Sequence, residues 1–243
     1  MRYRKERNVR VLPVLFNTDM VRAILDGRKT VTRRICKDGD DYTVPDMGFY
    51  SADKRTYAVH SYADKGHKDK LSIVERPCPF CPGDILYVRE KWCRNPASGE
   101  YYYVANRKKG AEAPYGLKWH PSIHMPKKVA RIWLKVTDVR VELLQKIDNV
   151  QILAEGANPC AISHYIKQMP EESEEWIHAA HVVEFQQLWD SAIKKVDIDR
   201  YGWDANPWVW VIEFERCEKP DENESAGSSE WKDNFMQRFC KVN

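Results

Sequence analysis

Hydrophobic positions near the start of the chain fall into two short patterns. The apolar run VLPVLF (11–16) predicts a buried strand. The next segment, NTDMVRAILDG (17–27), begins with capping residues, has apolar positions at helical spacing and ends in a glycine. It therefore predicts a helix that stops at Gly27.

Alternation after this glycine predicts a second strand. Neighbouring side chains of a strand point to opposite faces, so Thr30, Thr32 and Arg34 should share one side. Val31 and Arg33 should share the other.

Later segments continue the mixture of strands and helices. Segment 127–144 has the clearest period-two alternation in the chain, and 100–105 reads as the antiparallel neighbour of 85–92. With no internal repeat, this order predicts an α+β fold of barrel-like shape. The predicted strands are 85–92, 100–105, 127–144 and 207–217, and the predicted helices are 149–156 and 179–195.

The same patterning suggests how the chain is divided. Residues 1–216 are expected to form a single domain. Residues 37–76 are polar and lack a sustained period, so they are expected to be an irregular insertion with at most a small hairpin. Residues 217–243 are acidic at first and rich in Ser and Gly, which predicts a flexible tail.

Composition narrows the class of protein. No apolar run approaches the roughly 18 residues that cross a membrane, so no membrane partner is expected. Seven cysteines, an odd number, indicate reduced thiols in a cytoplasm and not a disulfide framework. The net charge of +3 neither requires nor excludes nucleic acid, because local clustering matters more than the sum.

A metal site is considered and not favoured. Cys78 and Cys81 have the spacing of a zinc half-site, but a structural zinc needs four ligands. Cys93, His120 and His124 are the remaining candidates, and no second pair has a matching spacing. Two idle thiols are the preferred interpretation, and no metal or cofactor is expected.

The short loop WHPSIHMPKK carries Ser122 and His124 between two prolines. A lone loop histidine is more often part of the scaffold than a catalyst, and a triad is defined in space and not by sequence order. The loop is retained as a candidate pocket wall.

Lys29, Thr32 and Glu155 form a candidate catalytic set. A hydroxyl needs a base to become a nucleophile, and a lysine serves if burial lowers its pKa. Bringing that pKa near 7 takes roughly 4–5 kcal/mol of unfavourable environment for the ammonium. Glu155 stands at a helix end, where the helix dipole does not favour a carboxylate. From the residues alone, ordinary structural roles remain the favoured reading.

Five blocks in one order resemble the ASCH-domain proteins, in particular the longer type found in bacteriophages and prophages. The resemblance runs over about residues 11–216. The blocks are MVRAILDGRKTVTRR, PGDILYVREKW, PSIHMPKKVARIWLKVTDVRVELLQKI, LAEG and NPWVWVIEFERC.

This resemblance implies a PUA-like fold, a small mixed β-barrel with flanking helices. The family signature is similar to G-x-K-x-x-E-x-R, in which Gly27, Lys29 and Arg34 match and Thr32 replaces the usual Glu. The small bacterial members that hydrolyse N(4)-acetylcytidine to cytidine and acetate share this replacement. Their Lys, Thr and later Glu fall on Lys29, Thr32 and Glu155.

The implied activity is acyl transfer from an acylated cytosine nucleoside or base, with Lys29 as base and Thr32 as nucleophile. A charged Lys29 that only polarises the carbonyl is the rival scheme. The implied substrate-binding residues are Arg34, Phe16, Ser122, His124 and Trp208, with Arg34 at the oxyanion and an aromatic ring stacked on the base.

Two other functions remain open. An RNA-binding module would use Arg28, Lys29, Arg33, Arg34 and the segment KKVAR as a phosphate footprint. A ribonuclease would depend on the same lysine.

Overall fold

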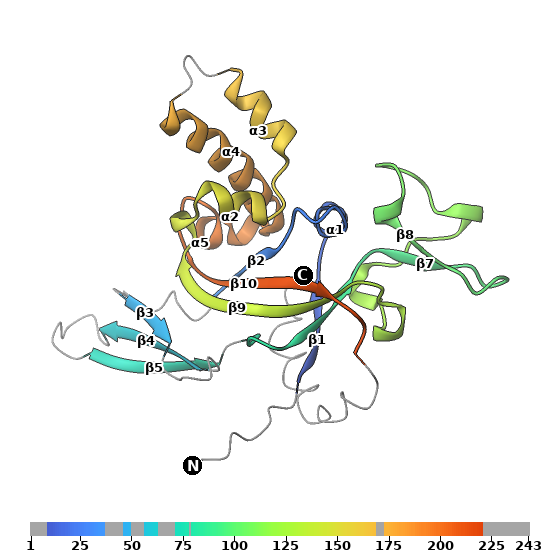
Figure 1. Cartoon of the computed structure of the whole chain (residues 1–243), viewed down its shortest axis with the longest axis horizontal. Coiled ribbons are helices and arrows are strands. Elements are labelled where there is room, and N and C mark those ends of the chain that lie inside the picture. Colours follow the sequence, from blue (N-terminus) through green and yellow to red (C-terminus); the bar gives the residue numbers. More distant parts are fainter. Residues whose placement is uncertain are drawn as a thin grey trace, which may run out of the picture. The chain divides into compact units, whose positions relative to one another are not determined.

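The computed structural model describes residues 9–36, 79–168 and 173–220, together with the backbone of three strands between 46 and 77 (Figure 1). These residues group into two compact units. The first unit lies within 1–25, 83–137 and 214–243, and the second lies within 26–82 and 138–213. The expectation of one domain over 1–216 stays a prediction, and the predicted flexible tail lies outside the described residues beyond 220.

Short strands and one helix make up the first unit. Strand β1 pairs in parallel with β6, and β6 pairs in antiparallel fashion with the start of β9. A separate antiparallel ladder joins β7 to β8, so the partner of the YYY segment is Trp92–Arg94, which overlaps the predicted partner 85–92 only at Trp92. The predicted pairing is wrong for the rest of that range, because β6 pairs with β1 and β9 instead. The elements are β1 (Val11–Leu15), α1 (Thr18–Leu25), β6 (Ile85–Arg89), β7 (Trp92–Arg94), β8 (Tyr101–Tyr103) and β9 (Trp133–Leu143), which continues into the second unit.

Helices dominate the second unit. Strand β2 pairs in antiparallel fashion with β10, with Thr32 opposite Ile212 and Arg33 opposite Val211. Its elements are β2 (Val31–Ile35), α2 (Asn149–Ala154), α3 (Pro159–Ile166), α4 (Glu174–Ala192), α5 (Ile198–Tyr201) and β10 (Trp208–Cys217), which ends in the first unit.

The fold is α+β with a mixed five-stranded sheet in the order β1-β6-β9-β10-β2. The predicted α+β class is confirmed. The sheet is not a closed barrel, so the barrel-like shape expected for it is wrong. The reason lies in the pairing: β1 joins only β6 and β2 joins only β10 within the described ladders, which leaves the two strands at opposite ends of the order.

Residues 37–76 contain more regular structure than the sequence indicated. Strands β3 (Asp46–Phe49), β4 (Thr56–Tyr62) and β5 (Leu71–Pro77) form an antiparallel sheet in the order β3-β4-β5. The expected single hairpin is therefore a three-stranded meander.

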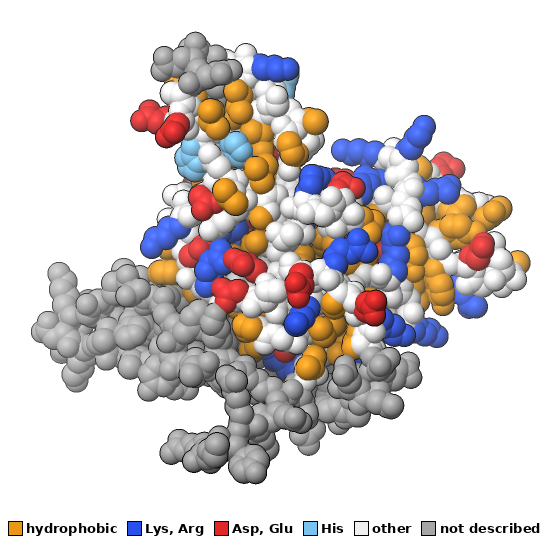
Figure 2. All heavy atoms as spheres, in the orientation of Figure 1, with side chains coloured by type: hydrophobic (Ala, Val, Ile, Leu, Met, Phe, Trp, Pro, Cys, Tyr) orange, Lys and Arg blue, Asp and Glu red, His pale blue; other side chains and the backbone are white. Residues whose placement is uncertain are grey.

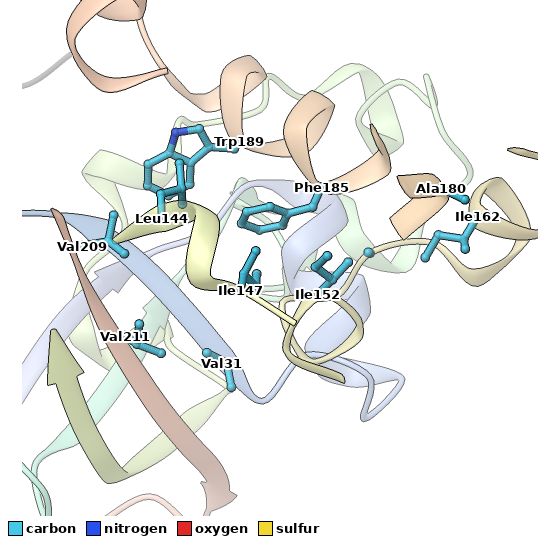
Figure 3. Packing of buried hydrophobic residues seen from close by; sticks show 11 residues of the cluster. Val31, Leu144, Ile147, Ile152, Ile162, Ala180, Phe185, Trp189, Val209 and Val211 are labelled. Carbon is cyan, nitrogen blue, oxygen red and sulfur yellow. The ribbon is translucent and has the colours of Figure 1, made fainter. Parts of the chain in front are cut away.

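A hydrophobic cluster in the second unit fixes the helices against strands β2 and β10. Val31, Val209 and Val211 project from the strands toward Ile152 of α2 and Phe185 of α4 (Figure 3). Each of these five side chains is buried, and full burial of such a side chain contributes roughly 1.5–3 kcal/mol. The cluster therefore sets the face of β2 that carries Val31 against α2.

Among the described residues, none of the helices combines the length and the apolar character needed to cross a membrane.

Candidate active site

A turn, a strand and a short helix of the second unit carry the predicted catalytic set. Gly27 has a φ of +74°, a left-handed conformation that glycine adopts without a Cβ penalty. The chain then passes Lys29 and enters β2 at Val31. The backbone N–H of Thr30 donates to the carbonyl of Ala154 at 2.8 Å, which ties this turn to the last residue of α2.

Glu155 is held by the end of that helix. At the start of α2, the side chain of Asp148 caps the helix by accepting from the N–H of Gln151 at 2.8 Å. At its other end, the N–H of Glu155 donates to the carbonyl of Gln151 at 2.8 Å, and Gly156 then takes a φ of +92°. The N–H of Gly156 also donates, to the carbonyl of Leu153 at 2.9 Å. These backbone hydrogen bonds fix the position from which the Glu155 side chain extends.

Lys29 and Glu155 meet in the interior. Lys29 is 2% exposed, and its Nζ lies 2.7 Å from Oε2 of Glu155. The same Nζ donates to the backbone carbonyl of Glu155 at 2.8 Å and to that of Val31 at 2.7 Å. An ammonium has three protons, so these three acceptors use all of them.

Burial and charge act in opposite directions on this lysine. Desolvation lowers the pKa of Lys29 below its ordinary value of 10.5, and this is the largest effect. The charge and hydrogen bond of Glu155 oppose it, whereas the positive charges of Arg34 and Arg33 add to it. The net direction is downward, as a lysine base requires.

Arg33 is the second cation on the Glu155 carboxylate, a role that its sequence pattern did not predict. Its Nη1 donates to Oε1 of Glu155 at 3.1 Å, so each oxygen of this carboxylate has its own cation. Its Nη2 donates to Glu142 at 2.5 Å and also to Gln151. The side chain is fully buried, and its guanidinium lies 6.0 Å from the ring centre of Phe185.

Thr32 has a different environment from Arg33. It is 1% exposed, and its Oγ1 has no hydrogen-bond partner among the residues that the structure describes. Because Arg33 shares a sheet face with Val31, alternation places Thr32 on the other face, as predicted. A buried hydroxyl without a partner is unfavourable by about 1–3 kcal/mol, and such groups gather at functional sites.

No hydrogen bond joins Thr32 to Lys29 in this arrangement, although the two residues are three positions apart. The nitrogen is already turned toward Glu155 and Val31. A proton transfer between Lys29 and Thr32 therefore requires Lys29 to give up at least one of its present contacts.

Two other predicted binding residues also belong to the second unit. Arg34 is partly exposed, and its Nη1 donates to the carbonyl of Arg33 at 3.1 Å. Desolvation lowers the pKa of Arg34, and the charge of Glu155 opposes this effect. Trp208 begins β10 and is half-buried, and its carbonyl accepts from the N–H of Cys36 at 2.9 Å.

The remaining predicted binding residues lie in the first unit. Phe16 is 3% exposed and its ring centre is 6.2 Å from that of Phe214, so it is a core residue in its own unit. Ser122 and His124 form one turn of 3-10 helix, in which Ser122 is half-buried and His124 is exposed.

The described zinc candidates do not form a metal site. Cys81 and Cys93 are buried free thiols, and Cys78 lies outside the described residues. Within the described part of the chain, no three His, Cys, Asp or Glu side chains are grouped as a metal site requires.

Comparisons of the chain with models of protein families, with curated proteins and with solved structures found no match.

Proposed function

We propose that this protein is an amidohydrolase that removes the acyl group from N(4)-acetylcytidine or a related N(4)-acylated cytosine, with Lys29, Thr32 and Glu155 as its catalytic residues. The proposal includes the family membership that the sequence blocks imply, with an open five-stranded sheet in place of the closed barrel of the PUA-like fold. It also places the protein in the cytoplasm, in keeping with the five free cysteines of the described residues.

One observation carries the proposal. Residues 29–32 contain two unusual side chains. Lys29 is buried and paired to the buried carboxylate of Glu155, and Thr32 has a buried hydroxyl with no hydrogen-bond partner among the described residues. A structural threonine in a strand normally satisfies its hydroxyl, and a structural lysine normally reaches solvent. Both exceptions suit a nucleophile and its base.

The hydrogen bond between Lys29 and Glu155 suggests how Lys29 becomes a base. Over the 2.7 Å hydrogen bond, a proton passes from Nζ to Oε2 of Glu155, which leaves a neutral amine and a neutral acid. The amine then releases a carbonyl acceptor and takes the proton of Thr32. The threonine oxygen forms a bond to the acyl carbon, and the C–N bond to cytosine breaks as Glu155 protonates the departing nitrogen.

Deacylation repeats the cycle with water. The neutral Glu155–Lys29 pair is restored by the same transfer, a water attacks the threonine ester, and the carboxylic acid leaves as Thr32 regains its proton. The guanidinium of Arg34, partly exposed beside this strand, is assigned to the oxyanion. Trp208 is assigned to stacking on the base.

Burial weighs against the alternative RNA footprint around the same turn. Lys29 and Arg33 are both about 2% exposed and both are paired to Glu155. A phosphate backbone needs cations at the surface, so only Arg28 and Arg34 of that cluster remain accessible in part.

The test is trapping of the acyl-enzyme. Purified protein is mixed with N(4)-acetylcytidine, quenched within one turnover and analysed by intact mass and peptide mapping, while cytidine and acetate are followed by chromatography. We expect an added acetyl group on the peptide that contains Thr32, and no such adduct in a Thr32→Val variant. Thr30→Val is the matched control, because Thr30 is exposed on the same turn. Product release without an adduct on Thr32, or no product from several acylated cytosines, contradicts the proposal.

A further inference from the structure

Five charged side chains lie on one face of three neighbouring strands of the second unit, β9, β10 and β2. Asp138, Arg140 and Glu142 take alternate positions of β9, so they point to the same face. Arg140 contacts Glu213 of β10, and Glu142 contacts Arg33 of β2, which places all five side chains on this face. Over the region that Figure 1 labels β9 and β10, Figure 2 shows red acidic side chains beside blue basic ones.

Their contacts form a series of ion pairs that starts at Glu155. Arg33 donates to Oε1 of Glu155 at 3.1 Å and to Oε1 of Glu142 at 2.5 Å. The other oxygen of Glu142, Oε2, accepts from Nε of Arg140 at 3.3 Å. Nη1 of Arg140 then donates to Glu213. The sign of the charge alternates at every step, and Glu142 bridges the two arginines with its two oxygens.

This ion-pair series runs from the interior to the surface. The exposed fraction of the side chain rises from 0% for Arg33 through 15% for Glu142 and 26% for Arg140 to 39% for Glu213. Asp138, also partly exposed, lies 4.0 Å from Nη1 of Arg140. An arginine does not give up its proton in a protein, so the series does not conduct protons. It transmits charge and position.

Stability alone is a weak reason for this arrangement. Three valines of β2 and β10 share the face and pack beneath the helices, so apolar side chains suit it. A partly exposed ion pair contributes little to the free energy of folding, and a buried one is often replaced by apolar residues without loss. The contacts do impose a specific geometry, because the guanidinium of Arg33 is held between the carboxylates of Glu155 and Glu142.

We propose that Glu142 and Arg140 are positioning residues for the Lys29–Glu155 pair. Glu142 holds the guanidinium of Arg33 in place on Oε1 of Glu155, and Arg140 orients Glu142 through its second oxygen. Their charges act on Lys29 with opposite signs. The catalytic consequence rests on the proposed function, whereas the electrostatic effect on Lys29 does not.

The charged groups that face Lys29 come from α2 and β2. Desolvation is the largest cause of the lowered pKa of Lys29, and Glu155, at the end of α2, opposes it. Arg34 and Arg33 of β2 add to the lowering. A change in the charge that compensates Arg33 should therefore reach Lys29 as a further shift of its pKa.

The two positioning residues should shift this pKa in opposite directions. Without the negative charge of Glu142, the positive charge of Arg33 is less compensated, so the pKa of Lys29 should fall further. Without the positive charge of Arg140, the pKa should rise, and by less, because Arg140 is one contact further along the series. A purely structural role predicts no such alternation of sign.

The first test compares pH–rate profiles for hydrolysis of N(4)-acetylcytidine. Glu142→Gln keeps an oxygen acceptor for Arg33 and removes the charge, so the acidic limb should move to lower pH by about half a unit or more. Arg140→Gln should move it to higher pH, and Glu142→Asp, which keeps the charge, should restore most of the wild-type profile. Glu175→Gln and Lys195→Gln are the matched controls, because they remove the same charges at exposed positions of the second unit and should shift nothing.

A second readout does not depend on catalysis. The Cε resonance of isotope-labelled lysine reports the pKa of Lys29 by NMR, since Lys29 is the one buried lysine in the described part of the chain. Glu142→Gln should lower this pKa and Arg140→Gln should raise it. If the wild type hydrolyses no acylated cytosine, the proposed function fails while this titration still tests the inference. An unchanged or raised pKa in Glu142→Gln, or an equal shift in Glu175→Gln, would overturn the proposal.

Discussion

Lys29 and Arg33 bind different oxygens of one buried carboxylate, Lys29 at Oε2 and Arg33 at Oε1 of Glu155. Two cations on one carboxylate leave a net positive charge, and in the described part of the chain Glu142, which Arg33 also contacts, offsets it. A buried arrangement of this kind rarely contributes much net stability, because desolvation offsets the attraction. The arrangement instead controls whether the proton resides on Lys29 or on Glu155.

Removing one partner of the Lys29–Glu155 pair should be strongly destabilising. In Lys29→Met, the carboxylate loses one of its two cations while it stays buried, so the free energy of unfolding should fall by about 3–5 kcal/mol. Urea unfolding measures this. Lys195→Met, at an exposed lysine, should change it by less than about 0.5 kcal/mol. The double variant Lys29→Met/Glu155→Gln should recover part of the loss, and additive losses would show that the two residues are not coupled.

The contribution of Lys29 to stability should rise with pH. Its pKa is lowered in the folded protein, so at low pH the folded state bears the full penalty of a buried ammonium. As the pH rises through the folded pKa, the native state loses this proton while the unfolded chain keeps it up to about 10.5. The difference in unfolding free energy between wild type and Lys29→Met should therefore grow over that window. A difference that is flat or falls with pH would contradict a lowered pKa.

Arg33 should act on catalysis through the charge state of Lys29. Its positive charge is one of the causes that lower the pKa of Lys29, so Arg33→Gln should raise this pKa. The pH–rate profile for N(4)-acetylcytidine should then shift its acidic limb to higher pH, and kcat should fall more than KM rises. Arg33→Lys, which keeps the charge, should restore part of the profile. An unshifted profile with reduced protein stability would mean that Arg33 is purely structural.

Packing under α2 should matter for both the fold and the site. Ile152 is fully buried in the cluster beneath this helix, so Ile152→Ala should lower the free energy of unfolding by about 2–5 kcal/mol. Val150, two residues earlier, is 76% exposed, and Val150→Ala should change it by less than about 0.5 kcal/mol. Thermal or urea unfolding of the two variants distinguishes them, and equal effects would contradict the described orientation of α2.

Local patterns predicted much of the secondary structure. Strand β1, helix α1 and helix α2 lie within the ranges expected from their apolar spacing and glycine stops. Helix α3 (Pro159–Ile166) was missed, although Asn158 caps it and proline occupies its first turn. Its apolar residues Ile162, Tyr165 and Ile166 have helical spacing, which was an available signal. Its packing against α4 is a long-range contact that a local pattern does not reveal.

The sequence predicted the catalytic residue types of the candidate site but not the contacts between them. Lys29 and Glu155 are 126 positions apart; the residues alone suggested the pair but favoured structural roles, and the resemblance gave it a catalytic one. Arg33 read as one more basic residue of a turn, because its partners Glu142 and Gln151 come from segments more than 100 positions away. The one available signal was alternation, which placed Arg33 on the same side as the buried Val31. An arginine on a buried face needs carboxylate partners.

The most direct measurement of the central claim is Thr32→Val, with stability and hydrolysis determined on the same preparation. Because the Thr32 hydroxyl has no hydrogen-bond partner in the described structure, its replacement by a methyl group should leave the free energy of unfolding unchanged or raise it by about 1 kcal/mol. Turnover of N(4)-acetylcytidine should nevertheless fall by about 1,000-fold or more, and Thr32→Ser should retain activity. A stable Thr32→Val protein that still hydrolyses the substrate would show that Thr32 is not the nucleophile.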